Sequence, residues 1–112
     1  MKVSVLIITI AAQIAFSCNK QKVDKSAPRC IDNKIEDFAK SCCPSGAHAD
    51  EYEFQDKTVY VLEPGNCGAD MSSAVYDKDC NSLGFLGGFV GNTKINGEEF
   101  SNAKFTKTVW SN

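Results

Sequence analysis

Cysteines are the residues of this 112-residue chain with the clearest chemistry. An odd number in the last 83 residues leaves at least one thiol outside any disulfide within that part. A disulfide between two cysteines near each other in the sequence would close a loop of about 14 residues and stabilise the fold by about 3 kcal/mol. Such pairs are Cys67 with Cys80 and Cys30 with Cys42 or Cys43. The disulfide candidates are Cys30, Cys42, Cys43, Cys67 and Cys80.

Cys42 and Cys43 are neighbours, and neighbouring cysteines rarely bond to each other because the peptide between them strains the disulfide dihedral. One of these two is therefore predicted to stay outside the disulfides. The chain has no CxxC motif, so we interpret that thiol as a packing residue and not as a redox site.

Asp77, Asp79 and Asn81 carry the alternating oxygen ligands that begin a calcium-binding loop. The sixth position of such a loop is normally Gly and the twelfth Glu, whereas this chain has Ser82 and Gly88 there. We therefore predict a polar hairpin turn, with these three residues kept as an incomplete calcium candidate. No other metal site and no cofactor is predicted.

His48 is the only histidine, and it lies in a stretch, 46–50, that we expect to be a loop. No thiol or hydroxyl can be placed beside it, so we expect an exposed residue and not a base or a metal ligand. The glycines of 87–91 lack the lysine and the helix that a phosphate-binding loop requires. The carboxylates fall at turns or on alternating strand positions. The chain is therefore not expected to be an enzyme.

The first 18 residues predict export. Lys2 precedes an apolar run, 3–16, which is shorter than the roughly 20 residues that cross a bilayer. Ser17-Cys18 then resembles the lipobox of bacterial lipoproteins, in which the signal is cleaved before the cysteine and the thiol carries acyl chains such as palmitate. Plain secretion is the alternative, because Ala15 and Ser17 also satisfy the small-x-small rule of an ordinary signal peptidase.

The predicted organisation has three parts: a signal peptide over 1–17, a lipidated Cys18 with a flexible tether over 18–29, and one globular domain over 30–112. Loss of 1–17 removes one basic residue and leaves 11 basic against 14 acidic residues, a net charge of −3. This charge argues against a nucleic-acid partner. The tether is polar and basic, so contact with anionic headgroups is its alternative role. Asn19 after the cysteine favours the outer membrane of the cell envelope.

Apolar residues at helical spacing predict a short amphipathic helix over 32–41. Asn33 and Glu36 offer a capping box at its start. Pro44 and Gly46 follow the helix and would end it. The residues that recur on its apolar face are Ile31, Ile35, Phe38 and Ala39.

Aromatic and β-branched runs at 51–54 and 57–63 flank Gln55-Asp56 and predict a β-hairpin. The uninterrupted apolar run within the second strand predicts a central strand covered on both faces. A second hairpin is predicted over 74–86, around a polar turn at 77–81.

The glycines after this hairpin predict a bulged strand or a loop that passes close to another element. Asn96-Gly97 marks a turn, and 104–110 is predicted to be a closing strand in which Phe105 and either Val109 or Trp110 are buried. The predicted fold class is α+β: one N-terminal helix packed on a small antiparallel sheet of four to five strands, stabilised by disulfides.

Several motifs occur in order along most of 30–112: Cys30 with Ile35, Tyr52-x-Phe54-x2-Lys57-x-Val59-Tyr60, Cys67, Tyr76-Asp77-x2-Cys80-Asn81 and Gly87-Gly88-x2-Gly91. Together they resemble a family of small bacterial lipoprotein domains with no assigned function. Relatives often carry a further cysteine where this chain has Gly84, so their disulfide pairing does not transfer. The resemblance implies export and a cysteine-bearing, β-rich domain, and it supplies no substrate.

Two functions are consistent with these features. The first is a membrane-anchored, non-catalytic binding or structural module at the cell envelope, which presents aromatic side chains to a protein or glycan. The alternative is a secreted protease-inhibitor-like scaffold, because the segment from Cys67 to Cys80 echoes part of the Kazal inhibitors. The aromatic residues expected at the surface are Tyr52, Tyr60, Tyr76 and Trp110.

Overall fold

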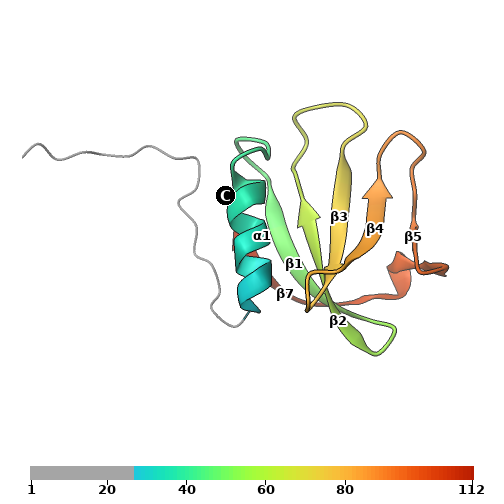
Figure 1. Cartoon of the computed structure of the whole chain (residues 1–112). Helices are drawn as coiled ribbons and strands as arrows, with labels where there is room; N and C mark the ends of the chain where they lie inside the picture. Colours follow the sequence, from blue (N-terminus) through green and yellow to red (C-terminus); the bar gives the residue numbers. More distant parts are fainter. Residues whose placement is uncertain (1–26) are drawn as a thin grey trace, which may run out of the picture.

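The computed structural model describes residues 27–112, in which one helix packs against a five-stranded antiparallel sheet (Figure 1). The strand order is β4-β3-β2-β1-β7, and β5 and β6 form a separate two-stranded sheet. The predicted α+β class is confirmed in this coarse form, although most of the described chain is strand. The elements are α1 (Arg29–Ala39), β1 (His48–Phe54), β2 (Lys57–Glu63), β3 (Ser72–Asp77), β4 (Ser82–Gly87), β5 (Lys94–Ile95), β6 (Glu98–Glu99), η1 (Phe100–Asn102) and β7 (Lys104–Ser111).

Helix α1 forms because its apolar residues recur every three to four positions and bury one face. It begins three residues before the predicted start, because Pro28 precedes it and the Pro28 carbonyl accepts hydrogen bonds from Ile31 and Asp32. The predicted capping box is wrong: Asn33 and Glu36 lie inside the helix and are exposed, and no side chain caps its start.

The first hairpin is confirmed. Gln55 and Asp56 have φ values of 53° and 60°, the conformation of a type I′ turn, which matches the twist of the flanking strands. Strand β1 begins earlier than predicted, at His48, because it pairs on both sides, with Glu63 of β2 and with Ser111 of β7. His48 is therefore a half-buried strand residue and not the loop residue that the sequence predicted.

Strand β2 is the predicted central strand, and its side chains build two cores on opposite faces of the sheet. Tyr60 and Leu62 pack on the face that α1 covers. Val59 and Val61 pack on the other face, against Ile95 at the start of the small sheet. The hydrophobic cores on the two faces explain why this strand is apolar without interruption.

The second hairpin and the closing strand are also confirmed, with bulges that the sequence did not locate. Between β3 and β4, Val75 pairs with Gly84 and Tyr76 pairs with Ser82, so one residue of β4 has no partner on β3. A register shift between β1 and β7 lets both Val109 and Trp110 reach the core on the α1 side, each 1 % exposed.

Phe105 of β7 is 58 % exposed, which contradicts its predicted burial. Strand β7 is the last strand of the sheet order, so no further strand covers its outer side. The Phe105 ring packs edge-to-face on the Tyr52 ring, with 5.6 Å between the ring centroids.

Two disulfides join distant parts of the chain, Cys30 to Cys80 and Cys43 to Cys67, with Cα–Cα distances of 6.1 and 5.7 Å. The local pairs favoured from the sequence are therefore wrong. The reason is tertiary: the start of α1 packs beside the β3–β4 turn, which brings together cysteines 50 residues apart. Cys42 takes part in neither disulfide, and its Sγ lies 3.6 Å from the Ala39 carbonyl oxygen.

The predicted signal peptide, the lipidated Cys18 and most of the predicted tether lie outside the described residues. Ala27 is buried in the core and Arg29 already belongs to α1, so the ordered domain starts before residue 30. Within 27–112, no helix is both long and apolar enough to cross a membrane.

Candidate functional site

The most unusual surface feature is the turn over 88–91, which we call the apolar turn. Gly91 donates a backbone hydrogen bond of 3.1 Å to the Gly88 carbonyl, which makes Phe89 and Val90 the two corner residues of a β-turn. Their side chains are 88 % and 85 % exposed, the highest exposures among the described large hydrophobic residues. Corner positions usually carry polar residues, glycine or proline, so two large apolar side chains there require an explanation.

Backbone contacts hold the apolar turn in place. Gly87 and Asn92 exchange two backbone hydrogen bonds of 2.8 and 3.1 Å at its base. The Asn92 side-chain amide donates to the carbonyl oxygens of Phe85 and Lys94, at 2.6 and 2.8 Å. Gly88 donates to the Met71 carbonyl at 3.1 Å. The turn is therefore fixed without any contribution from its two corner side chains.

Glycine is needed at the base of this turn. Gly87 has φ of +78°, and a Cβ there would lie 3.2 Å from the Met71 carbonyl oxygen. Met71 ends the loop between β2 and β3, and its Sδ lies 3.7 Å from Cys43 Sγ of the Cys43–Cys67 disulfide. That disulfide therefore lies beside the segment that supports the apolar turn. The sequence prediction of a glycine-rich segment whose backbone passes close to another element is confirmed.

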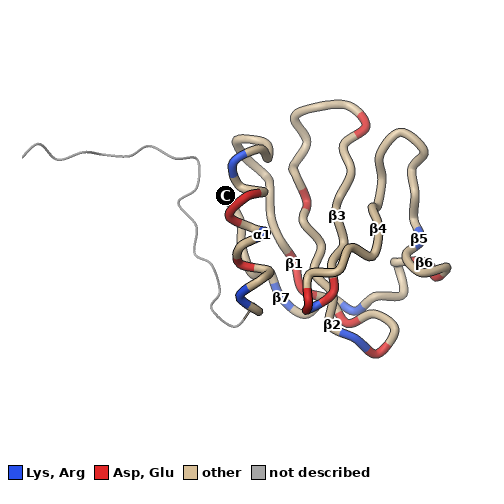
Figure 2. Tube along the Cα trace, in the orientation of Figure 1, with Lys and Arg blue, Asp and Glu red and all other residues tan. Residues whose placement is uncertain are grey.

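Figure 1 shows the loop between β4 and β5 at the end of the sheet away from the start of α1. Charged residues gather at the opposite end, near the β1–β2 and β3–β4 turns, while the trace of the β4–β5 loop carries none (Figure 2). The apolar turn is thus away from most of the charged residues of the described surface, although the neighbouring β2–β3 loop carries one acidic residue, Asp70.

The aromatic residues that the sequence predicted to face a partner are placed differently. Tyr60 and Trp110 are 2 % and 1 % exposed, so both belong to the core and that prediction is wrong for them. Burial, and then the hydrogen bond that its hydroxyl donates to Glu51 at 3.0 Å, raise the pKa of Tyr60. Tyr52 and Tyr76 are half-buried and pack at the margins of the two cores.

Sequence reasoning missed the apolar turn, although a signal was present. Phe89 and Val90 stand between Gly88 and Gly91, and two adjacent large apolar residues within a glycine turn have no strand or helix face to bury them.

The incomplete calcium candidate is a self-contained turn. One carboxylate oxygen of Asp77 accepts hydrogen bonds from the backbone N–H groups of Asp79 and Asn81, each at 2.9 Å, and the other accepts from the Asn81 amide at 3.0 Å. The Asn81 hydrogen bond is the largest reason that the pKa of Asp77 falls below its ordinary value. These contacts use the Asp77 oxygens to fold the turn.

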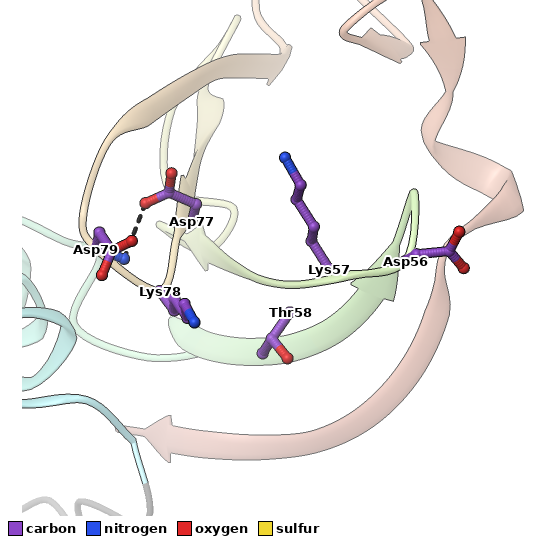
Figure 3. Close-up of a pocket in the computed structure, with 6 residues that line it drawn as sticks. All are labelled: Asp56, Lys57, Thr58, Asp77, Lys78 and Asp79. Carbon is purple, nitrogen blue, oxygen red and sulfur yellow. Dashed lines mark hydrogen bonds between the residues drawn. The ribbon is translucent and has the colours of Figure 1, made fainter.

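The surface beside this turn is a cavity of about 370 Å³ with mixed charge (Figure 3). Its lining combines three aspartates, two lysines and a threonine: Asp56, Lys57, Thr58, Asp77, Lys78 and Asp79. Figure 3 shows the Asp56 side chain extending away from the Asp77 turn. Besides the hydrogen bond from Asn81, the charge of Lys57 is one of the causes that lower the pKa of Asp77. Among residues 27–112, no group of three or more His, Cys, Asp or Glu side chains is arranged to hold a metal ion.

His48 has specific partners at the edge of the sheet. Its Nδ1 lies 3.0 Å from a carboxylate oxygen of Asp50, whose other oxygen accepts a 2.8 Å hydrogen bond from the Thr108 hydroxyl. Asp50 is 6 % exposed, one of the few buried polar residues described. The sequence could not place these groups together, because Thr108 comes from β7, which lies beside β1 only in the fold.

The fold and the turn together define a small, disulfide-bonded α+β domain with an exposed apolar turn. A family model described as Domain of unknown function (DUF6970) matches residues 36–112, and the chain belongs to this family. No curated protein and no solved structure matches the chain. The resemblance predicted from the motifs is confirmed as far as an uncharacterised domain family.

Proposed function

We propose that this protein is a bacterial envelope lipoprotein whose domain is a non-catalytic binding module, and that the apolar turn is the element that contacts a protein partner. The observation that carries the proposal is the exposure of Phe89 and Val90 on a turn that needs neither side chain. Burying one such side chain in a partner contributes about 1.5–3 kcal/mol. A turn that is already ordered loses little entropy on binding.

Charge favours a protein pocket over a lipid surface. Segment 85–93 contains no Lys or Arg, and the chain without 1–17 has a net charge of −3. Attraction to anionic headgroups requires basic residues near the inserting element. Phe89 and Val90 form a compact apolar knob between glycines, and a protein pocket of matching shape would accommodate such a knob.

The non-catalytic part of the proposal rests on how the reactive groups are used. Four cysteines form disulfides, Asp77 folds its own turn, and His48 pairs with a buried carboxylate. The disulfides and the Asp77 contacts serve the fold. The surface that remains is suited to binding.

The proposed anchor rests on the resemblance of Ser17-Cys18 to a lipobox, and its acyl chains on Cys18 would insert into the bilayer. Asn19 after the cysteine favours the outer membrane. Intact mass of protein extracted from membranes tests it, before and after reduction and alkylation. We expect the mass of 18–112 plus acyl chains, with two disulfides. An unlipidated mass would contradict the anchor and favour the alternative, a secreted inhibitor, which inhibition assays against serine proteases would then test.

Photo-cross-linking tests the binding role of the apolar turn. Benzoylphenylalanine replaces Phe89 in the full chain in cells, and a matched probe replaces Asp56, an exposed residue of the β1–β2 turn. We expect a protein adduct of one discrete mass from position 89, lost when Val90→Asp is added, and none from position 56. Equal adducts from both positions, or adducts with lipid only, would overturn the proposal.

A further inference from the structure

A second concave site lies at the other edge of the sheet, where β1 and β7 pair. It is an open groove of about 590 Å³. Ala49 and Trp110 point from these strands into the core under α1. Side chains alternate along a strand, so Asp50 and its partner Thr108 lie on the face that α1 does not cover. The groove is therefore separate from the apolar turn, which follows β4 at the opposite edge.

A buried carboxylate forms the floor of the groove. Asp50 lines it and is 6 % exposed. The Thr108 hydroxyl that donates a hydrogen bond to Asp50 carries no charge. The contact between His48 and Asp50 is an ion pair only when His48 is protonated. A carboxylate removed from water is costly unless a positive charge compensates it. The floor can therefore receive a cation.

An exposed aromatic ring forms the wall. Phe105 lines the groove and is 58 % exposed. It pairs across the strands with Tyr52, two residues from Asp50 on the same face of β1, and packs edge-to-face on the Tyr52 ring. The face of an aromatic ring attracts a cation that stacks on it.

Apart from His48, Asp50 is the one charged side chain among the described residues that line the groove. Among the described residues that line the groove, none is Lys or Arg. Glu63 of β2 lies opposite His48 of β1 in the strand register. The Ser73 hydroxyl donates a hydrogen bond to the Glu63 carboxylate. Burial, followed by the charges of Asp50 and Glu63, raises the pKa of Tyr52. Both carboxylates thus act on the same face.

We propose that this groove binds a guanidinium group, such as the side chain of an arginine in a peptide. The planar group would stack on Phe105 and donate an N–H to Asp50 at its edge, with the Ser111 hydroxyl on the rim as a further acceptor. A flat cation meets an aromatic wall and a carboxylate floor at the same time, which an ammonium group does less well. The proposal does not depend on the function proposed for the apolar turn.

The test is an NMR titration of the full 15N-labelled chain with N-acetyl-arginine methylamide, compared with the neutral isostere N-acetyl-citrulline methylamide. We expect saturable shifts at His48, Asp50 and Thr108 with the arginine compound only. Asp50→Asn should weaken binding about tenfold or more, the loss of one charged hydrogen bond. Phe105→Ala should weaken it about threefold, as for an exposed cation–π contact.

Phe85→Ala is the matched control, because Phe85 is 55 % exposed but lies on β4 at the opposite edge of the sheet. It should leave binding unchanged. If Asp50→Asn does not fold, the Phe105 and Phe85 pair decides. Equal shifts with the citrulline compound, equal effects of the two Phe substitutions, or shifts that do not saturate would each overturn the proposal.

Discussion

Two turns flank strand β4, and they are stabilised in different ways. In the polar turn over 77–81, the Asp77 carboxylate accepts three hydrogen bonds from the turn itself, so a side chain holds the backbone. In the apolar turn over 88–91, backbone bonds to Met71 and Asn92, the Asn92 side-chain amide at the base and the glycine conformations hold the chain. Phe89 and Val90 contribute nothing to that support.

In the polar turn the side chains are committed to the fold, whereas in the apolar turn the corner side chains are available for other contacts. A polar turn whose side chains satisfy its own backbone has little left to offer a partner. A turn held by its backbone leaves its corner side chains unconstrained by stability. Apolar residues at such corners are costly to expose, so their presence points to contact with another molecule.

The largest expected effect concerns the disulfide that fixes the polar turn to α1. Replacing Cys30 and Cys80 together by Ser should lower the free energy of unfolding by about 4 kcal/mol, because a disulfide with a sequence separation of 50 closes a long loop. Urea denaturation of the oxidised protein measures this. A loss below about 1 kcal/mol would show that packing alone holds α1 against the turn.

A smaller effect is expected from the side chain that organises the polar turn. Asp77→Ala should lower the free energy of unfolding by about 1–2 kcal/mol, because three hydrogen bonds are lost from a partly exposed site. Asp79→Ala is the matched control, since Asp79 gives only its backbone N–H to these bonds. It should cost less than about 0.5 kcal/mol. Equal losses in the two variants would contradict the role given to Asp77.

The same carboxylate should make the polar turn sensitive to acid. Hydrogen bonding, above all from Asn81, lowers the pKa of Asp77 in the folded state below its ordinary value of 3.8. A lowered pKa contributes stability above the unfolded-state value, and this is lost as pH falls through the folded-state value. The difference between the wild type and Asp77→Ala should therefore be constant near neutral pH and shrink below about pH 4. Unfolding midpoints across this range measure it, and a difference that grows in acid would contradict it.

Elements with strong local signals could be predicted from the sequence. The Gln55-Asp56 hairpin, the two-sided strand β2 and the helical apolar stripe all depend on residues near one another in the chain. The start of α1 was missed because a proline decided it and not the apparent capping box around Asn33. Local chemistry therefore determined the elements but not each of their ends.

What depends on tertiary contact could not be predicted. The disulfide partners of Cys30 and Cys43 are fixed by which strands meet which loops, and loop length alone favoured the wrong pairs. The groove at Asp50 is formed by β1 and β7, which are the first and the last of the described strands along the sequence and pair only in the fold. The exposure of Phe89 likewise follows from the Met71 contact that fixes the apolar turn beyond the sheet.

The smallest effect on stability is also the most direct test, because the central claim is that the apolar turn holds its shape without its corner side chains. Equilibrium urea unfolding of the double variant Phe89→Ser with Val90→Ser should give a free energy within about 0.5 kcal/mol of the wild type, as for other exposed positions. A loss of about 2 kcal/mol or more would contradict the claim, because it would show that Phe89 and Val90 belong to the core of the domain and not to a surface kept for a partner.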